Sequence, residues 1–233
     1  MPEKTNSNKF VSVVIPTLNE EKNIGTVMTG TADFLKKRKY GYEMIIVDGY
    51  SDDKTVQIAK KYGAEIIFDN KGKGSALKNG MRHARGDIIV TMDADCSHTP
   101  REMGLLIEGI QAGFDICMGS RFIQGGGTED MPFHRRLGNK FFVGLVNLFW
   151  KTKYSDLCYG YRSFSKSGAK LHKEIESDGF GIEAEIAIKA AKNKLRILEV
   201  PSFEKARSNG AGKLRTFRDG WVILKTILRE VGS

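Results

Sequence analysis

The chain has 233 residues and a formal net charge of +9 at pH 7, with 37 Lys or Arg against 28 Asp or Glu. This length is ample for a large α/β domain. The charge suits an anionic partner such as a phosphate-bearing substrate, an anionic lipid or a nucleic acid, although solubility alone also explains it. Three widely spaced cysteines argue against a disulfide framework or a zinc site, and no apolar run reaches the roughly 18–20 residues that span a bilayer. The polar N-terminus lacks a signal-peptide core, so we expect a reduced, intracellular protein.

The first half of the chain alternates short apolar runs with helix-like segments. The runs are rich in Ile and Val without strict polar alternation, which is typical of strands buried on both faces. The segments between them begin at capping or acidic residues, and several end at glycine. This alternation predicts a doubly wound, mostly parallel α/β sheet. The predicted strands are residues 10–16, 43–48, 64–68, 87–93 and 115–120. The predicted helices are residues 19–38, 51–63, 74–86 and 100–113.

The pattern changes after residue 120. Residues 123–136 are Gly-rich and charged and predict a mobile loop, whereas residues 138–154 are aromatic and apolar between basic flanks. We find no internal repeat, low-complexity tract or linker, so we predict one domain over residues 1–233. Its nucleotide-binding-like half covers about residues 10–120, and its elaborated half about 121–233. The remaining predicted elements are a helix at 179–194, a strand at 195–203, a basic loop at 204–215 and a helix at 217–231.

Acidic residues follow several predicted strands, at the edge where open parallel sheets bind ligands. Asp93 and Asp95 end the fourth strand, and in an extended chain residues i and i+2 face the same side. Two convergent carboxylates predict a Mg²⁺ or Mn²⁺ site, although a loop-capping pair is the alternative. His98 is a third candidate, either as a ligand or orienting group or as a packed loop side chain.

Three further features of this edge suggest ligand-binding roles. Asp48 ends the second strand and could accept hydrogen bonds from a nucleobase or ribose, or cap the next helix. Gly72 and Gly74 flank Lys73 before a helix start, a weak motif for a phosphate cradle. Arg121 ends the fifth strand, where its guanidinium could reach a phosphate.

Six segments in series extend this pattern over nearly the whole chain. They are VVIPTLNEEKNI, IIVDGYSDDKT, GKGSALKNGMRHARGDIIVTMDADCSHTP, GSRF, SDLCYGYRSF and EVPSFEKARSNGAGKLRTFRDGW. With these motifs the chain resembles the family 2 glycosyltransferases of the GT-A fold. More narrowly, it is similar to the branch of dolichyl-phosphate mannose synthases and polyprenyl-phosphate hexose synthases. The resemblance implies a GT-A domain with a Rossmann-like nucleotide-binding half.

The resemblance also implies roles for individual residues. The nucleoside would be bound by Pro16, Thr17, Glu20 and Asp48, and the metal by Asp93 and Asp95, with Lys73, Ala94 and Ser97 beside the nucleotide sugar. The diphosphate or acceptor phosphate would be held by Arg121, Arg207 and Lys213. Two departures from the family pattern concern base and sugar selection. Gly49 stands where a second aspartate is frequent, and the bulky Tyr159 stands where a small residue is usual.

The implied reaction moves a hexose, mannose or glucose, from a nucleotide diphosphate sugar to a polyprenyl or dolichyl phosphate, with inversion. Asp93, Asp95, Arg207 and Lys213 would stabilise the leaving nucleoside diphosphate. A phosphate acceptor is largely ionised at neutral pH and needs no base, whereas a hydroxyl acceptor would. Asp156 is the candidate base, or else a structural carboxylate that anchors Arg162 or a turn.

Two alternatives remain open at this point. One is a family 2 enzyme with a soluble or glycan hydroxyl acceptor, and the other is a non-catalytic nucleotide- or polyanion-binding protein. Nucleic-acid binding has no motif behind it and is not expected.

A lipid acceptor requires a membrane. Residues 140–154 combine aromatic and aliphatic side chains with Lys140, Lys151 and Lys153, a pattern that suits the interface of an anionic membrane. The alternative is a core helix that covers the sheet. We therefore predict peripheral association with the cytoplasmic membrane face, directly or through a membrane partner.

Overall fold

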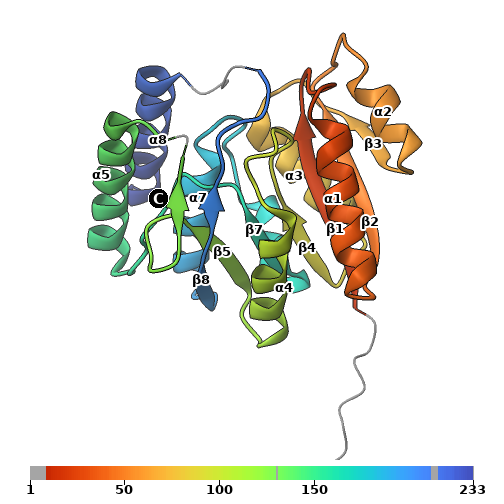
Figure 1. The fold of residues 1–233 in the computed structure, drawn as a ribbon. Helices are drawn as coiled ribbons and strands as arrows, with labels where there is room; N and C mark the ends of the chain where they lie inside the picture. Colours follow the sequence, from red (N-terminus) through yellow and green to blue (C-terminus); the bar gives the residue numbers. More distant parts are fainter. Residues whose placement is uncertain (1–8, 130, 211–214, 233) are drawn as a thin grey trace, which may run out of the picture.

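The computed structural model describes residues 9–129, 131–210 and 215–232. Its centre is a seven-stranded sheet with the order β3-β2-β1-β4-β7-β5-β8 (Figure 1). β7 is antiparallel to its neighbours β4 and β5, whereas the other adjacent strands of this sheet pair in parallel. The strands are β1 (Phe10–Thr17), β2 (Gly41–Asp48), β3 (Glu65–Phe68), β4 (Ile88–Thr91), β5 (Ile116–Ser120), β7 (Arg162–Ser165) and β8 (Ile197–Pro201).

The sheet is buried on both faces, as its uninterrupted apolar strands require. In β1, Val13 and Ile15 belong to one hydrophobic core and Val14, between them, to the other, because successive side chains of a strand point to opposite faces. Both cores are therefore assembled on the same short strands. A second, parallel sheet pairs β6 (Gly127–Thr128) with β9 (Phe203–Glu204).

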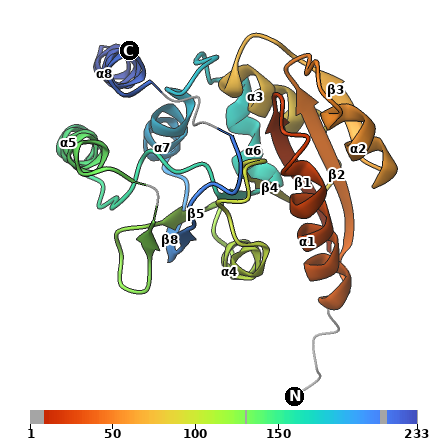
Figure 2. The ribbon, with the colours of Figure 1, turned by 45° about the horizontal axis from the view of Figure 1, so that its top comes forward.

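Helices cover the two faces of the large sheet in separate layers (Figure 2). On one face lie α1 (Ile24–Lys37), α2 (Thr55–Lys61) and α4 (Met103–Gln111). On the other face lie α3 (Lys73–His83) and α7 (Ile182–Lys192), with α5 (Phe133–Trp150) and α8 (Thr216–Val231) packed outside α7. The short elements are η1 (Pro100–Glu102), α6 (Lys166–Ala169) and η2 (Lys170–Lys173).

The predicted doubly wound, mostly parallel sheet is confirmed, and three local predictions are wrong. The fourth strand ends at Thr91 rather than at residue 93, because the chain turns into a bend in which Cys96 has φ 67°. The segment 123–136 is not a continuous loop, since it contains β6 and the first turn of α5. β7 was not predicted, because its sequence Arg-Ser-Phe-Ser is too short and polar to resemble a buried strand.

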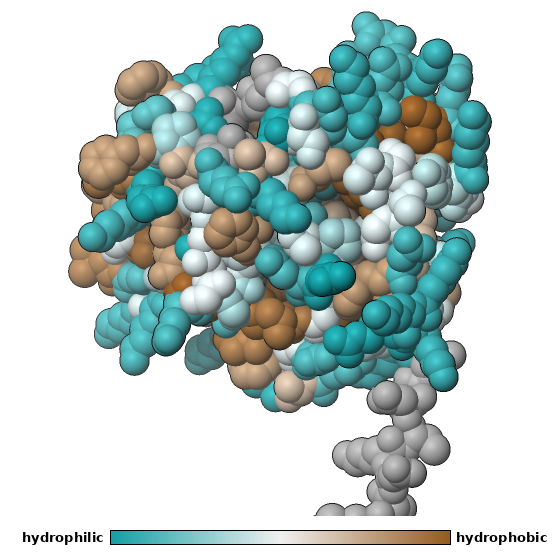
Figure 3. Space-filling model, viewed as in Figure 1, coloured by the Kyte–Doolittle hydropathy of each residue, from teal (hydrophilic) through white to brown (hydrophobic). Residues whose placement is uncertain are grey.

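The apolar segment around residues 138–154 forms most of α5, which is not an ordinary core helix. Its buried residues are Asn139 and Val146, whereas Leu148 is 72% exposed. The side of the molecule formed by α5 accordingly shows several hydrophobic side chains at its surface (Figure 3). Among the helices of the described residues, none combines the length and the apolar content that a bilayer crossing needs.

Candidate active site

A cavity of about 660 Å³ opens at the carboxyl edge of the parallel strands and continues between α5 and α8. It brings together most of the residues that the sequence singled out. Its wall includes Pro16, Thr17, Glu20, Lys73, Asp93, Ala94, Asp95, Ser97, Arg121 and Arg207. Asp48 and Asp156 are buried behind this wall, and Lys213 lies outside the described residues.

Asp95 is held from two sides at the cavity. One carboxylate oxygen, Oδ1, accepts hydrogen bonds from the Ser97 backbone N–H at 3.0 Å and the Ser97 hydroxyl at 2.6 Å. The other, Oδ2, forms an ion pair with the Arg207 guanidinium at 2.7 Å. A more distant contact of 3.9 Å joins Arg207 to Glu20. These contacts bring a loop arginine, far away in sequence, against the acidic strand edge.

Asp93 takes part in a second cluster. Lys73, the first residue of α3, lies 2.8 Å from Asp93 and 3.0 Å from Glu183, which sits in the first turn of α7. A Cβ on Gly160 would lie only 3.1 Å from the Lys73 ammonium, so glycine leaves room for these three charges to converge. Burial alone would raise the pKa of Asp93, but mainly the Lys73 ammonium, with a smaller contribution from Arg207, lowers it to about 2. Asp93 is therefore an anion over the whole physiological pH range.

His98 orders the bend after β4. Its Nδ1 accepts the Asp93 backbone N–H at 3.1 Å, and its ring stacks on Tyr161 with centroids 4.6 Å apart. Burial lowers the pKa of His98, so the neutral imidazole with its proton on Nε2 fits this hydrogen bond. Of the roles considered, these contacts support a packed side chain that orients the bend, and a role as a metal ligand stays a prediction.

Asp48 lies behind the cavity wall and supports a residue of that wall. It is fully buried and accepts hydrogen bonds from the Thr17 hydroxyl at 2.8 Å and from the Ser51 backbone N–H and hydroxyl at 2.7 Å each. These bonds fix Thr17 on the cavity wall. The direct contact of Asp48 with a nucleoside stays a prediction.

The glycines beside Lys73 do not form a phosphate cradle. The backbone N–H groups of Gly74 and Ser75 donate to the Asp178 carbonyl at 2.7 and 3.1 Å, so the start of α3 is already capped by protein. A Cβ on Gly72 or Gly74 would lie 2.5 Å from a backbone oxygen of residues 177–178. The prediction is wrong because these glycines serve a close approach of two backbone segments.

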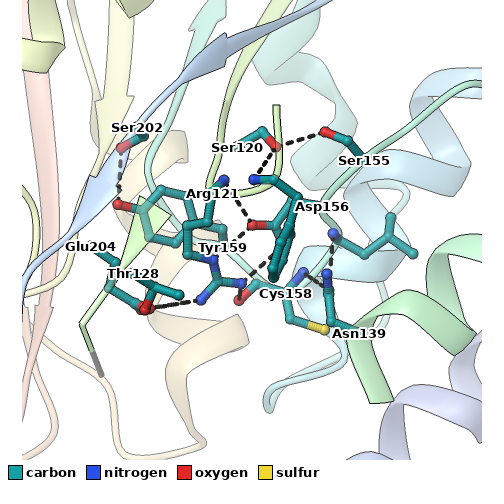
Figure 4. Close-up of polar contacts among 12 residues, drawn as sticks. Ser120, Arg121, Thr128, Asn139, Ser155, Asp156, Cys158, Tyr159, Ser202 and Glu204 are labelled. Carbon is teal, nitrogen blue, oxygen red and sulfur yellow. Dashed lines mark hydrogen bonds and ion pairs between the residues drawn. The ribbon is translucent and has the colours of Figure 1, made fainter. Parts of the chain in front are cut away.

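Arg121 and Asp156 form a buried ion pair, and neither side chain is available for its predicted role (Figure 4). Two nitrogens of the guanidinium donate to the Asp156 carboxylate at 2.7 and 2.9 Å, and the third donates to Glu204 at 3.1 Å. Asp156 is 1% exposed, so the structure corrects its assignment as a base, and it anchors Arg121 rather than Arg162. Arg162 instead donates to the backbone carbonyls of Leu157, Tyr159 and Glu183.

The bulky Tyr159 is accommodated inside this network. The Arg121 guanidinium lies 4.6 Å from the centre of its ring, and its hydroxyl is 2.9 Å from that of Ser202. Gly119 makes room for the ring, since a Cβ there would lie 2.9 Å from it. The tyrosine therefore packs under Arg121, and its departure from the family pattern has a structural explanation.

Glu183 and Arg135 are among the cavity residues that the sequence reasoning missed. Glu183 looked like an ordinary acidic residue in the first turn of a helix, yet its side chain is 7% exposed and reaches Lys73. Arg135 precedes the apolar segment and lies on the cavity wall, where its Nε donates to the Thr216 hydroxyl at 3.1 Å. The basic pair at residues 135–136 ahead of an apolar helix was the available signal for Arg135.

The donor set suits a hard divalent cation that is shared with a substrate. Asp93 and Asp95 offer carboxylate oxygens to the cavity, which Mg²⁺ and Mn²⁺ prefer. Within the described residues, no group of three or more His, Cys, Asp or Glu side chains is arranged to hold a metal ion. The protein would therefore supply part of the coordination shell, and phosphate oxygens and water the rest.

A mostly parallel sheet with an Asp-x-Asp bend at its carboxyl edge and a cation-lined cavity defines the GT-A class of fold. Solved structures of glucosyl-3-phosphoglycerate synthase from Mycobacterium tuberculosis share this fold. The complex with phosphoglyceric acid has a TM-score of 0.74 at 21% identity and covers 96% of this chain and 80% of its own. The complex with Mn²⁺, uridine diphosphate and glucosyl-3-phosphoglycerate has a TM-score of 0.71 at 21% identity, with the same coverage.

The chain belongs to glycosyl transferase family 2, whose model matches residues 12–171. It is 36% identical over 213 residues to the dolichol-phosphate mannosyltransferase of Pyrococcus furiosus, which covers 88% of this chain. The chain spans 59% of the length of that enzyme. It is 31% identical over 220 residues to the dolichyl-phosphate hexose transferase of Haloferax volcanii, covering 94% of this chain and 92% of that protein.

Proposed function

We propose that this protein transfers a hexose, with inversion, from a nucleotide diphosphate sugar to a polyprenyl phosphate such as dolichyl phosphate. The observation that carries the proposal is the continuity of the cavity, which joins the acidic strand edge to an apolar groove between α5 and α8. A nucleotide sugar matches the first end and a lipid the second. The names of the Pyrococcus and Haloferax relatives support the same pair of substrates.

At the strand edge, we assign the nucleoside to the surface formed by Pro16, Thr17 and Glu20, which Asp48 supports from behind. Asp93 and Asp95 would hold Mg²⁺ or Mn²⁺, whose charge would offset that of the departing diphosphate. The Mycobacterium synthase crystallised with Mn²⁺ and uridine diphosphate supports a divalent cation. Lys73, Ala94 and Ser97 line the adjacent wall, and Lys213 stays a prediction for the diphosphate.

Between the two ends, cationic side chains meet the place where a lipid phosphate would lie. These are Arg135 and Arg207, and the His134 side chain lines the same part of the cavity. An ionised phosphate oxygen would attack C1 of the hexose on the face opposite the diphosphate. The new C1–O bond forms as the old one breaks, and the nucleoside diphosphate leaves. No proton has to be removed, which agrees with the burial of Asp156.

At the helix end, the exposed apolar side chains suit a membrane surface. Phe217 is 92% exposed and Trp221 57%, and both also line the cavity. Lys140, Lys151 and Lys153 are exposed on and after α5, where they can meet anionic headgroups. We infer peripheral binding to the cytoplasmic face of the membrane, alone or with a membrane partner.

The test uses the purified chain with anionic vesicles that contain polyprenyl phosphate, and a panel of UDP- and GDP-hexoses. We expect a lipid-linked hexose from at least one donor, in a reaction that EDTA stops and Mg²⁺ or Mn²⁺ restores. Vesicles with the matching polyprenol serve as the control, since they offer a hydroxyl in place of the phosphate. Transfer to polyprenol or to a soluble glycan instead would favour the hydroxyl-acceptor alternative. Nucleotide binding without any transfer would favour a non-catalytic protein.

A further inference from the structure

We propose that Arg207 and the divalent cation compete for Asp95, so that the cation can bind fully only after this arginine has left the carboxylate. The released guanidinium then becomes available to the phosphates in the cavity. The inference rests on the metal site of the proposed function. It adds that the Arg207 side chain lowers the affinity of that site for the divalent cation, and that the position of this side chain depends on whether the cation is bound.

The first observation is that Asp95 has little remaining capacity for a ligand. Ser97 donates two hydrogen bonds to Oδ1, from its backbone N–H and its hydroxyl. Arg207 takes Oδ2 at 2.7 Å, and the Asp95 side chain is only 8% exposed. A metal ion bonds to carboxylate oxygens directly, so on Oδ2 it would meet the positive charge of a guanidinium already at hydrogen-bond distance, and the two cations oppose each other there.

The second observation is that Arg207 is held loosely compared with the other cation of the site. Its Nε is buried without a hydrogen-bond partner among the described residues, and its contact with Glu20 is 3.9 Å long. Lys73, by contrast, bridges Asp93 and Glu183 at 2.8 and 3.0 Å. Moving the Lys73 ammonium away would leave two carboxylates without their counterion. When the Arg207 side chain moves away, it loses only one close partner, and its unsatisfied Nε–H regains a hydrogen bond to water. Arg207 is therefore the cation that yields.

The third observation is that the loop itself can stay in place while the side chain moves. The backbone N–H of Lys205 donates to the Ser97 carbonyl at 3.0 Å, and that of Ser208 to the Asp95 carbonyl at 3.4 Å. These bonds hold the backbone on both sides of Arg207 beside the bend. A rotation of the arginine side chain thus turns its charge from Asp95 toward the cavity that it already lines.

The experiment measures Mn²⁺ binding to the full chain without nucleotide, by the electron paramagnetic resonance signal of free Mn²⁺. We expect Arg207→Ala to bind Mn²⁺ on the order of tenfold more tightly than the wild type, since it removes a charged hydrogen-bond partner of the ligand oxygen. Arg207→Lys should show a smaller gain. The matched control is Lys205→Ala, which removes one positive charge from an exposed side chain of the same loop.

An equal Mn²⁺ affinity for Arg207→Ala and Lys205→Ala would overturn the inference, because the effect would then be one of net charge. Failure of the proposed metal site looks different: wild type, Arg207→Ala and Asp95→Asn would all bind Mn²⁺ equally weakly. Thermal unfolding of each variant shows whether the comparison concerns folded protein. If Arg207→Ala fails to fold, the comparison between Arg207→Lys and Lys205→Ala decides in the same way.

Discussion

At the strand end of the cavity, Asp95 is 6% exposed and both of its carboxylate oxygens are bound, whereas at the helix end Phe217 is 92% exposed. The two ends also differ in how their side chains are positioned. Near the first, Asp48, Asp93 and Arg121 are each held by several specific polar contacts. At the second, Ile223 and Ile227 of α8 are buried, whereas Phe217 and Trp221 of the same helix are exposed.

This difference indicates a division of labour along the cavity. Precisely oriented charges are needed where a leaving group develops charge, because misdirected dipoles stabilise a transition state poorly. A prenyl chain needs only apolar surface, which mobile side chains provide without fixed geometry. Changes at the strand end should therefore affect chemistry or folding sharply, and changes at the helix end should act in proportion to the apolar area removed.

The largest effect is expected where the network is most buried. Asp156→Ala leaves the Arg121 guanidinium buried without its main partner, and breaking a buried pair costs about 3–5 kcal/mol of folding free energy. Chemical denaturation measures this loss. The control is Asp178→Ala, whose carboxylate pairs with Lys78 at the surface with 52% exposure, so it should cost less than about 1 kcal/mol. Unchanged stability together with lost transfer would restore Asp156 as a candidate base.

The next effect concerns catalysis at Asp95. Asp95→Asn keeps the shape of the side chain and its hydrogen bond from Ser97 but removes the charge that a cation needs. We expect hexose transfer to fall about 100- to 1,000-fold, by analogy with the loss of one stabilising group in an active site. The thermal midpoint should change little in comparison. Initial rates at saturating Mg²⁺ or Mn²⁺ test this, and a rate within a few-fold of wild type would contradict the metal assignment.

At the strand end of the cavity, the sequence predicted many of the residues that gather there but not how they contact one another. Apolar runs identified β1, β2, β4 and β5, and the acidic residues at the ends of the first, second and fourth predicted strands indicated the ligand-binding edge. The bend after β4 could not be predicted, because a non-glycine residue such as Cys96 rarely adopts a positive φ. The pairing of Arg121 with Asp156 could not be predicted either, since the sequence contains many charged residues and does not show which of them form ion pairs.

The helix end was less predictable for a different reason. The segment of α5 looked equally suited to a core and to an interface, because periodicity shows which side chains share a face but not what covers that face. The structure distinguishes the two by exposure, since Leu148 and Phe149 are 72% and 47% exposed. The joining of α5 and α8 into one groove depends on tertiary packing, which a single helix pattern does not contain.

A third prediction probes the helix end directly. Trp221→Ser should weaken the affinity for anionic vesicles, measured by co-sedimentation, about 10- to 100-fold. The reason is that an aromatic side chain buried in the membrane contributes roughly 1.5–3 kcal/mol to the free energy of binding. Nucleotide affinity, measured by calorimetry, should stay near the wild-type value. The control is Leu105→Ser on α4, an apolar residue of 42% exposure on the other face of the sheet. Equal loss of vesicle binding in both variants would argue against a membrane surface at α8.

The smallest effect is expected where α8 is anchored to α7 by charge. Glu230 is 1% exposed and forms ion pairs with Lys192 at 3.0 Å and Lys189 at 3.1 Å. Burial alone would raise the pKa of Glu230, but hydrogen bonds from these two lysines lower it below its ordinary value of 4.5. A carboxylate with a lowered pKa in the folded protein stabilises it above pH 4.5, and this contribution is lost as the pH falls through the lowered pKa.

Glu230→Gln should therefore reduce the free energy of unfolding by about 0.5–1.5 kcal/mol at pH 7, because the glutamine amide oxygen still accepts a hydrogen bond from a lysine and only the contribution of the charge is lost. Its difference from wild type should shrink as the pH falls from 4.5 through the lowered pKa, because the carboxylate takes up its proton first in the unfolded chain and then in the folded protein. Urea denaturation at pH 7 and at successively lower pH measures both values. Glu176→Gln serves as the control, since this glutamate pairs with Arg229 but its side chain is 64% exposed. A pH-independent difference for Glu230→Gln would mean that the charge of Glu230 does not stabilise the packing of α8 against α7.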